Sequence, residues 1–89
     1  MAETALTREH ILSVVKKYIR EALEDVDVER IDTSLSMKDL GANSLDIVEV
    51  VSRTMRELRI KVPRSELSKL SNIDGLVDLL HEVALARAR

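Results

Sequence analysis

The sequence predicts an all-α domain: a four-helix bundle with a long loop between the first two helices and a short third helix. Apolar residues make up 45% of the 89 residues and recur at spacings of three and four along three segments. With two glycines and one proline, the chain lacks the turn residues that a sheet of many strands needs. Its length allows one core, so we expect a single domain over residues 1–89 with a core at about 7–86.

The first helix is expected to follow Thr7, a good N-cap residue, and to run to about Leu23. Its apolar stripe has the period of a helix and comprises Ile11, Val15, Ile19 and Ala22. Charged side chains fall largely outside this stripe. The helix is therefore amphipathic and needs partners that cover its apolar face.

The segment 24–43 does not follow the helical pattern, because several aspartates and Gly41 interrupt it. Apolar residues nevertheless recur irregularly along it, at Val26, Val28, Ile31, Leu35 and Leu40. A loop exposed to water would not need these side chains. We therefore expect a long, packed loop whose apolar side chains anchor it to the bundle.

The second helix is predicted over Ser44–Leu58, with Ser44 as its N-cap and Asp46 near the positive end of the helix dipole. Its predicted apolar stripe comprises Val48, Val51, Met55 and Leu58, broadened by Ile47 and Val50. The opposite stripe is charged and comprises Asp46, Glu49, Arg53 and Arg56.

Pro63 is expected to stop the second helix, because proline disfavours helical geometry at the residue before it. A short helical turn is predicted from Ser65 to about Leu70, and a last helix from near Asn72 to about Ala86. The apolar stripe of that last helix comprises Ile73, Leu76, Val77, Leu80 and Val83.

The composition excludes several classes of function. Without cysteine there are no disulfides and no thiolate chemistry, and His10 and His81 are too isolated to predict a metal site. The chain has no basic patch, tryptophan or phenylalanine, which argues against nucleic acid, and no apolar run long enough for a membrane. The first residues do not form a signal peptide, so we expect a cytoplasmic protein. We also expect it to be a monomer. The start at Met1 predicts a free-standing protein, with an excised module as the alternative.

The junction before the second helix has the most informative sequence. It reads Asp39-Leu40-Gly41-Ala42-Asn43-Ser44-Leu45-Asp46. Gly41 and Ala42 are small and would leave room for another macromolecule to approach. Ser44 then presents a hydroxyl at a helix N-terminus, where free N–H groups and the dipole favour an anion such as a phosphodiester. No residue nearby resembles a general base, so Ser44 is better suited to being modified than to acting as a nucleophile.

This octet resembles the phosphopantetheine attachment motif of acyl carrier proteins, and with the helix order the resemblance extends over nearly the whole chain. The resemblance implies a four-helix bundle of the acyl-carrier type with no catalytic activity. It implies that a phosphopantetheinyl transferase moves 4'-phosphopantetheine from coenzyme A to Ser44. The thiol of that arm would then carry acyl groups as thioesters between enzymes.

The resemblance also implies a recognition helix that begins at Leu45. The residues expected to contact partner enzymes are Asp46, Glu49, Arg53 and Arg56. A solvated charged face is the alternative for the two arginines, since Glu49 and Arg53 are suitably spaced for a helical ion pair worth about 0.2–0.5 kcal/mol.

The charge pattern and the motif narrow the resemblance. From Ser44 onward there are seven acidic and eight basic residues, whereas recognition helices of fatty-acid carriers are usually strongly acidic. Weak steering towards basic fatty-acid enzymes is therefore expected. The chain looks more like discrete carriers of polyketide and antibiotic biosynthesis. It is similar in particular to donor carriers that supply acetyl groups to a hydroxymethylglutaryl (HMG)-synthase-like enzyme during β-branching, with acyltransferases and ketosynthases as further partners.

Three alternatives remain at this point. The chain can be a carrier of fatty-acid synthesis, or a peptidyl carrier of nonribosomal synthesis, although Gly41-Ala42-Asn43 differs from the usual peptidyl-carrier motif. From a different class of function, it can be an unmodified helical interaction domain in which Ser44 serves only as a cap.

Overall fold

The computed structural model describes residues 7–23, 26–67 and 72–87 and confirms the all-α prediction. Over these residues the chain forms four α-helices and two short 3-10 helices. They are α1 (Arg8–Ala22), η1 (Val28–Arg30), η2 (Lys38–Leu40), α2 (Ser44–Leu58), α3 (Arg64–Leu67) and α4 (Ile73–Arg87). None of the helices in these ranges is long and apolar enough to cross a membrane.

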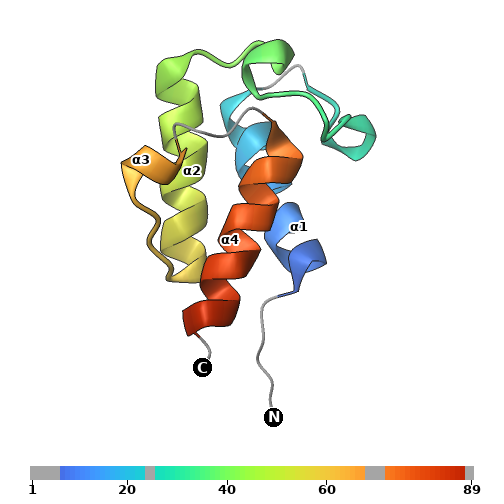
Figure 1. The fold of residues 1–89 in the computed structure, drawn as a ribbon. Coiled ribbons are helices and arrows are strands. Elements are labelled where there is room, and N and C mark those ends of the chain that lie inside the picture. The colour runs from blue at the N-terminus through green and yellow to red at the C-terminus, as the bar shows by residue number, and fades with distance from the viewer. Residues whose placement is uncertain (1–6, 24–25, 68–71, 88–89) are drawn as a thin grey trace.

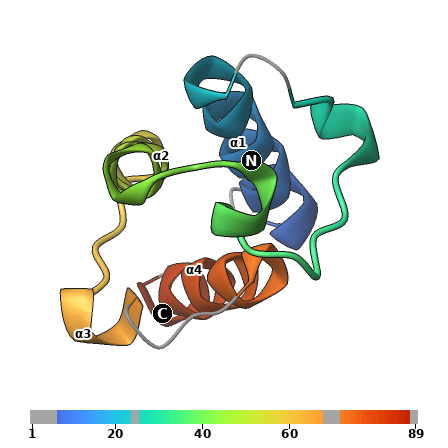
Figure 2. The ribbon, with the colours of Figure 1, turned by 90° about the horizontal axis from the view of Figure 1, so that it is seen from above.

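The three long helices form a bundle in which α1 packs against both α2 and α4 (Figures 1 and 2). Helices α2 and α4 run in the same general direction and α1 runs opposite to them, so the first residues of α2 and α4 lie at the same end of the bundle. The segment with η1 and η2 crosses that end, and α3 lies on the side of the bundle away from α1 (Figure 2).

Helix α1 begins and ends as the sequence predicts. The Thr7 side chain accepts a hydrogen bond of 3.0 Å from the His10 backbone N–H, which is the expected N-cap. The buried residues of α1 are Ile11, Val14, Val15 and Ile19. Three of these four were expected from the periodicity, so the amphipathic stripe identifies the buried face correctly.

The buried face of α2 is rotated from the predicted one. Val48, expected in the apolar stripe, is 55% exposed, and Thr54 is completely buried instead. Val50, Thr54 and Leu58 follow each other at intervals of four and face the core. The Thr54 hydroxyl donates to the Val50 carbonyl oxygen at 2.7 Å, so its burial leaves no polar group unpaired.

The loop between α1 and α2 is packed, as predicted, and four of its five predicted anchors lie against the core, namely Val26, Val28, Ile31 and Leu40. Val28, Met37 and Ala42 are buried, whereas Leu35 is 38% exposed, so the prediction of Leu35 as an anchor is wrong. The backbone of this segment also connects it to α4. The Leu35 carbonyl oxygen accepts from the Ile73 N–H at 3.0 Å and the Thr33 carbonyl oxygen accepts from Asp74 at 2.9 Å. These bonds pair first-turn N–H groups of α4 that have no partner within the helix.

Helix α2 ends before Pro63 acts on it, which corrects the predicted cause of the helix stop. Arg59 adopts a left-handed conformation with φ of 58°, and the Ile60 N–H then donates to the Met55 carbonyl oxygen at 3.0 Å. Ile60 and Val62 are buried and hold the outgoing chain against the bundle. Helix α3 begins one residue before the predicted turn, whose last residues, 68–70, lie outside the described part of the chain.

Candidate functional site

The N-terminus of α2 is capped by a reciprocal pair of hydrogen bonds between Asn43 and Asp46. The Asn43 side-chain oxygen accepts from the Asp46 N–H at 2.8 Å, and the Asp46 carboxylate accepts from the Asn43 N–H at 3.2 Å. This arrangement is a capping box with Asn43 as the N-cap. The prediction that Ser44 caps the helix is therefore wrong, because the residue before it does so.

Ser44 is the first residue of α2 and is exposed. Over the described part of the chain, its hydroxyl makes no hydrogen bond, and the backbone N–H groups of Ser44 and Leu45 have no acceptor. The positive end of the dipole of α2, a helix of 15 residues, also lies here. The junction thus offers an accessible hydroxyl next to two free N–H donors, which suits a phosphate ester.

The turn before Asn43 fixes the direction from which the chain enters α2. Gly41 has φ of 102°, a left-handed conformation that glycine adopts without steric cost. The Ala42 N–H donates to the Met37 carbonyl oxygen at 3.0 Å, and both of these residues are buried. Ala42 therefore packs inward. The expectation that its small size leaves room for a partner macromolecule is wrong. Gly41 is exposed, and no atom lies near the position that a β-carbon would take. Glycine is therefore favoured here by the left-handed backbone conformation and not by a lack of space.

Asn43→Ala is expected to destabilise the fold by about 1 kcal/mol, because it removes the side-chain cap of α2. Ser44→Ala should change the free energy of unfolding by less than about 0.5 kcal/mol, as is typical of an exposed site without special contacts. Urea denaturation of the two variants measures this difference. An equal or larger loss for Ser44→Ala would contradict Asn43 as the cap.

Two apolar side chains near the start of α2 are exposed. Leu45 is 80% exposed and Val48 is 55% exposed, and both follow Ser44 within one helical turn. Exposed apolar residues of this size are suited to contact with a partner protein. The sequence analysis assigned Val48 to the core and gave Leu45 no role, so it missed this apolar patch.

An apolar groove lies beneath the same end of the bundle. Its volume is about 360 Å³, and α2 contributes Ile47 and Val51, α3 contributes Leu67 and α4 contributes Ile73 and Leu76. A second hollow of about 480 Å³ continues along α2 and shares Ile47, Val51 and Leu67 with the first. Apolar space of this size can take an apolar group.

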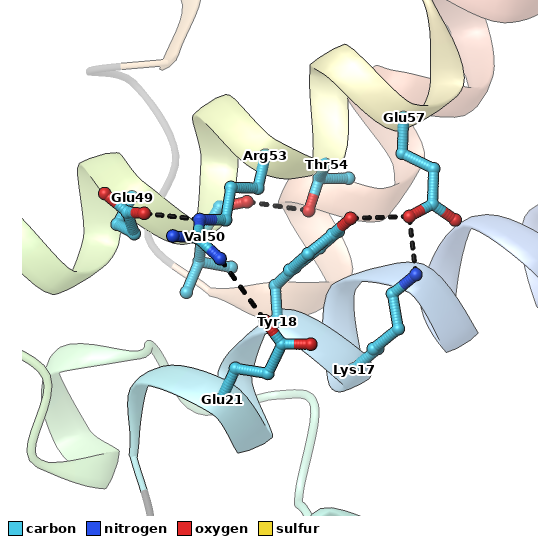
Figure 3. Close-up of polar contacts among 8 residues, drawn as sticks. All are labelled: Lys17, Tyr18, Glu21, Glu49, Val50, Arg53, Thr54 and Glu57. Carbon is cyan, nitrogen blue, oxygen red and sulfur yellow. Dashed lines mark hydrogen bonds and ion pairs between the residues drawn. The ribbon is translucent and has the colours of Figure 1, made fainter.

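The charged residues on α2 have unequal surroundings. The Asp46 carboxylate takes part in the capping box. Arg53 makes an ion pair with Glu49 on its own helix and one of 3.3 Å with Glu21 of α1, so it links two helices (Figure 3). Arg56 is exposed and makes no ion pair within the described residues. Of the four residues predicted to contact partners, Arg56 is therefore the one with no competing interaction.

Glu57 is paired across the helices and is not available to Arg56. Lys17 and the Tyr18 hydroxyl, both on α1, donate to the same carboxylate oxygen of Glu57 (Figure 3). These two hydrogen bonds, Lys17 first, lower the pKa of Glu57. The same bonds raise the pKa of Lys17 and that of Tyr18. The carboxylate is consequently ionised at neutral pH and holds α1 to α2 beside the Arg53 link.

Comparison with known proteins identifies the class to which this fold and site belong. The family model described as "Phosphopantetheine attachment site" matches residues 13–80. The chain is 31% identical over 77 residues to the polyketide biosynthesis acyl-carrier-protein AcpK of Bacillus subtilis, covering 86% of this chain and 94% of that protein. It is 34% identical over 74 residues to an acyl carrier protein of Campylobacter lari, covering 82% and 95%. It is also 34% identical over 61 residues to methylphloroacetophenone synthase of Cladonia uncialis, covering 68% of this chain and 2% of that synthase. No solved structure matches the chain.

The chain belongs to the acyl carrier protein family, whose members are non-catalytic carriers with covalently attached 4'-phosphopantetheine. Carriers of this kind work with a phosphopantetheinyl transferase and with synthase enzymes. The junction at α2 is chemically suited to the group, since it combines a free hydroxyl, two free N–H donors and the positive end of a helix. When attached, the arm supplies a thiol that holds acyl groups as thioesters. Membership of this family excludes the third alternative, an unmodified helical interaction domain.

Proposed function

We propose that Ser44 is the residue that carries the phosphopantetheine arm. The observation that supports this most strongly is that the residue that caps α2 is not the serine. Asn43 satisfies the cap through Asp46, and the Ser44 hydroxyl, one residue later, has no bond to another described residue. A transferase can therefore use this hydroxyl without breaking a structural hydrogen bond. The free N–H groups of the first turn would then face the phosphate.

We further propose that the chain serves polyketide biosynthesis and donates acetyl groups to an HMG-synthase-like enzyme. The relative named as a polyketide biosynthesis carrier covers 86% of this chain and supports the pathway. The near-neutral charge of the second half of the chain supports a partner other than a uniformly basic enzyme. The donor role itself is supported by the resemblance of the motif region to such carriers.

A carrier of fatty-acid synthesis is the second candidate. The Campylobacter lari relative, named only as an acyl carrier protein, is as similar to this chain as the polyketide relative is. The groove of about 360 Å³ is also larger than an acetyl group needs, which is compatible with a longer acyl chain. The two candidates differ in the enzyme that accepts the loaded carrier.

We propose that partner enzymes contact the outer face of α2. The face contains the predicted charged residues Asp46, Glu49, Arg53 and Arg56, together with exposed Leu45 and Val48. Leu45 and Val48 would supply apolar contact close to the arm. Arg56 would supply a positive charge about 18 Å further along the helix, since each residue of an α-helix adds about 1.5 Å.

Charge reversal at Arg56 tests both the face and the donor role. Arg56→Glu should weaken docking to the HMG-synthase-like enzyme by about 1–3 kcal/mol, because it places a negative charge opposite an acidic surface of that enzyme. Arg53→Glu should reduce docking and also lower the melting temperature, because Arg53 bridges Glu21 and Glu49. Acetyl transfer from the loaded carrier and thermal melting measure the two effects separately.

The same assay distinguishes the candidate pathways. Rapid transfer of acetyl to the HMG-synthase-like enzyme and slow transfer to a fatty-acid condensing enzyme is the result expected of a donor carrier. The reverse order would favour the fatty-acid candidate. Unchanged transfer by Arg56→Glu would show that this cation is not part of the docking face.

A further inference from the structure

The other end of α2 has a hollow with an unusual rim of positive charge. Its volume is about 540 Å³, and its apolar lining comes from Met55 of α2, from Ile60 just after α2 and from Val83 of α4. The polar lining consists of Arg56, Arg59 and Lys61, with no acidic residue. The hollow lies where α2 and α4 both end (Figure 1), opposite the end that carries Ser44.

The three cations have no ion pair in the described residues. Elsewhere on the molecule Arg8, Lys17 and Arg53 are each bound to acidic side chains. Arg56, Arg59 and Lys61 are exposed and have no such partner within the ranges that the structure describes. One cation in the last turn of α2, Arg56, already suffices to complement the negative end of the helix dipole. The other two are therefore not explained by that role.

Arg59 also adopts a costly backbone conformation. It is the one non-glycine residue with positive φ in the described ranges, at 58°. Glycine is the usual residue at this position of a helix C-terminus, because a β-carbon is unfavourable in the left-handed region. An arginine at such a position makes the fold less stable than glycine would, so we expect its side chain to have a role other than stabilising the fold.

We propose that this hollow is a second docking surface, which binds an acidic segment of a partner protein with an apolar side chain in its centre. The three cations would contact carboxylates and the floor of Met55, Ile60 and Val83 would take the apolar residue. The surface lies about 16–22 Å from Ser44 along the axis of α2, from Met55 to Arg59. It therefore lies apart from the attachment site and shares only Arg56 with the proposed partner face of α2, so the test below uses Arg59 and Lys61, which are not part of that face.

A protein segment fits this surface better than a nucleic acid does. Single strands bind by stacking on aromatic side chains, and none of the lining residues is aromatic. The chain as a whole carries a net charge of −2, which repels a long polyanion. A short acidic peptide with an apolar centre matches both the rim and the floor.

The test uses a short fluorescein-labelled peptide that is rich in glutamate and has a central pair of leucines. We expect the peptide to bind the unmodified chain and to shift the backbone amide resonances of Met55, Ile60, Lys61 and Val83. Arg59→Gly should weaken the affinity about tenfold, equivalent to about 1.4 kcal/mol. The same substitution should hold or raise the melting temperature, because glycine relieves the left-handed strain. Opposite effects on binding and stability distinguish a docking residue from a structural one.

Arg30→Gln is the matched control, since Arg30 is an exposed arginine of η1 outside the hollow, and it should bind the peptide as the parent chain does. Lys61→Gln should weaken binding in the same direction as Arg59→Gly. Phosphopantetheine loading should be unchanged in both hollow variants, whatever the donor role proves to be. Unchanged peptide affinity in Arg59→Gly, or resonance shifts confined to the Ser44 end, would overturn the proposal. Tighter binding of an oligothymidine strand at the same residues would overturn it as well, in favour of a general polyanion surface.

Discussion

Ser44→Ala is expected to accept no phosphopantetheine when it is incubated with coenzyme A and a broad-specificity transferase, whereas the parent chain should gain one group. The physical reason is that the junction, residues 39–46, contains no other side-chain hydroxyl. Ser44 combines exposure, a position at the start of α2 and two free N–H groups. Because Asn43 caps the helix, the variant should keep its fold, and intact mass measures the loss directly.

Ser52→Ala and Ser65→Ala are the controls for this loss. Ser52 lies in the middle of α2, where no free N–H groups are available, and Ser65 lies in the four-residue helix α3. Both variants should be modified to the same extent as the parent chain. Full modification of Ser44→Ala would contradict the assignment, and loss of modification in either control would point to a different serine.

Leu80→Ala is expected to destabilise the fold by about 2–5 kcal/mol, because it leaves a cavity at a completely buried position of α4. A chain of this length is expected to have a total stability of about 4–13 kcal/mol. The substitution should therefore leave a substantial fraction of the molecules unfolded, or abolish the fold. Urea denaturation followed by circular dichroism measures the change, with an unchanged slope if the transition stays two-state.

Leu85→Ala on the same helix is the matched control, since Leu85 is 45% exposed. Its effect on the free energy of unfolding should stay within about 0.5 kcal/mol, apart from the small gain from the better helix propensity of alanine. Equal losses in Leu80→Ala and Leu85→Ala would contradict the packing of α4 against α1.

The bounds of the long helices and the buried faces of α1 and α4 were predictable from the sequence because the periodicity of these segments is strong. The Thr7 cap and the buried Ile11, Val15 and Ile19 of α1 follow directly from the sequence, and so does the buried face of α4 at Ile73 and Leu80. In each case one face is apolar over several turns. Such a pattern fits one orientation on the bundle, so local and tertiary preferences agree.

The errors arose where apolar character alone was used to predict burial. Thr54 was missed because a hydroxyl that bonds to the carbonyl four residues earlier can be buried at little cost. Leu35 is exposed because its backbone, rather than its side chain, fastens the loop to α4. Such backbone bonds join segments far apart in the chain and leave no pattern in the local sequence.

The site was predictable in its position but not in its details. The octet located the start of α2 correctly, yet Asn43 and Ser44 are both good cap residues by propensity. The reciprocal bond with Asp46, three residues after Asn43, decides between them, and this spacing is a capping-box signal that the sequence contains. The ion pair between Arg53 and Glu21 depends on how α1 and α2 pack, so the sequence could not reveal it.

Peptide mapping of the loaded carrier tests the central claim most directly. After incubation of the parent chain with coenzyme A and the transferase, proteolysis and tandem mass spectrometry locate the added group. The phosphopantetheine should lie on Ser44, in the peptide that contains the junction between η2 and α2, with one group per chain. Phosphopantetheine on Ser36, Ser52 or Ser65, or no modification of a correctly folded chain, would contradict Ser44 as the point of attachment.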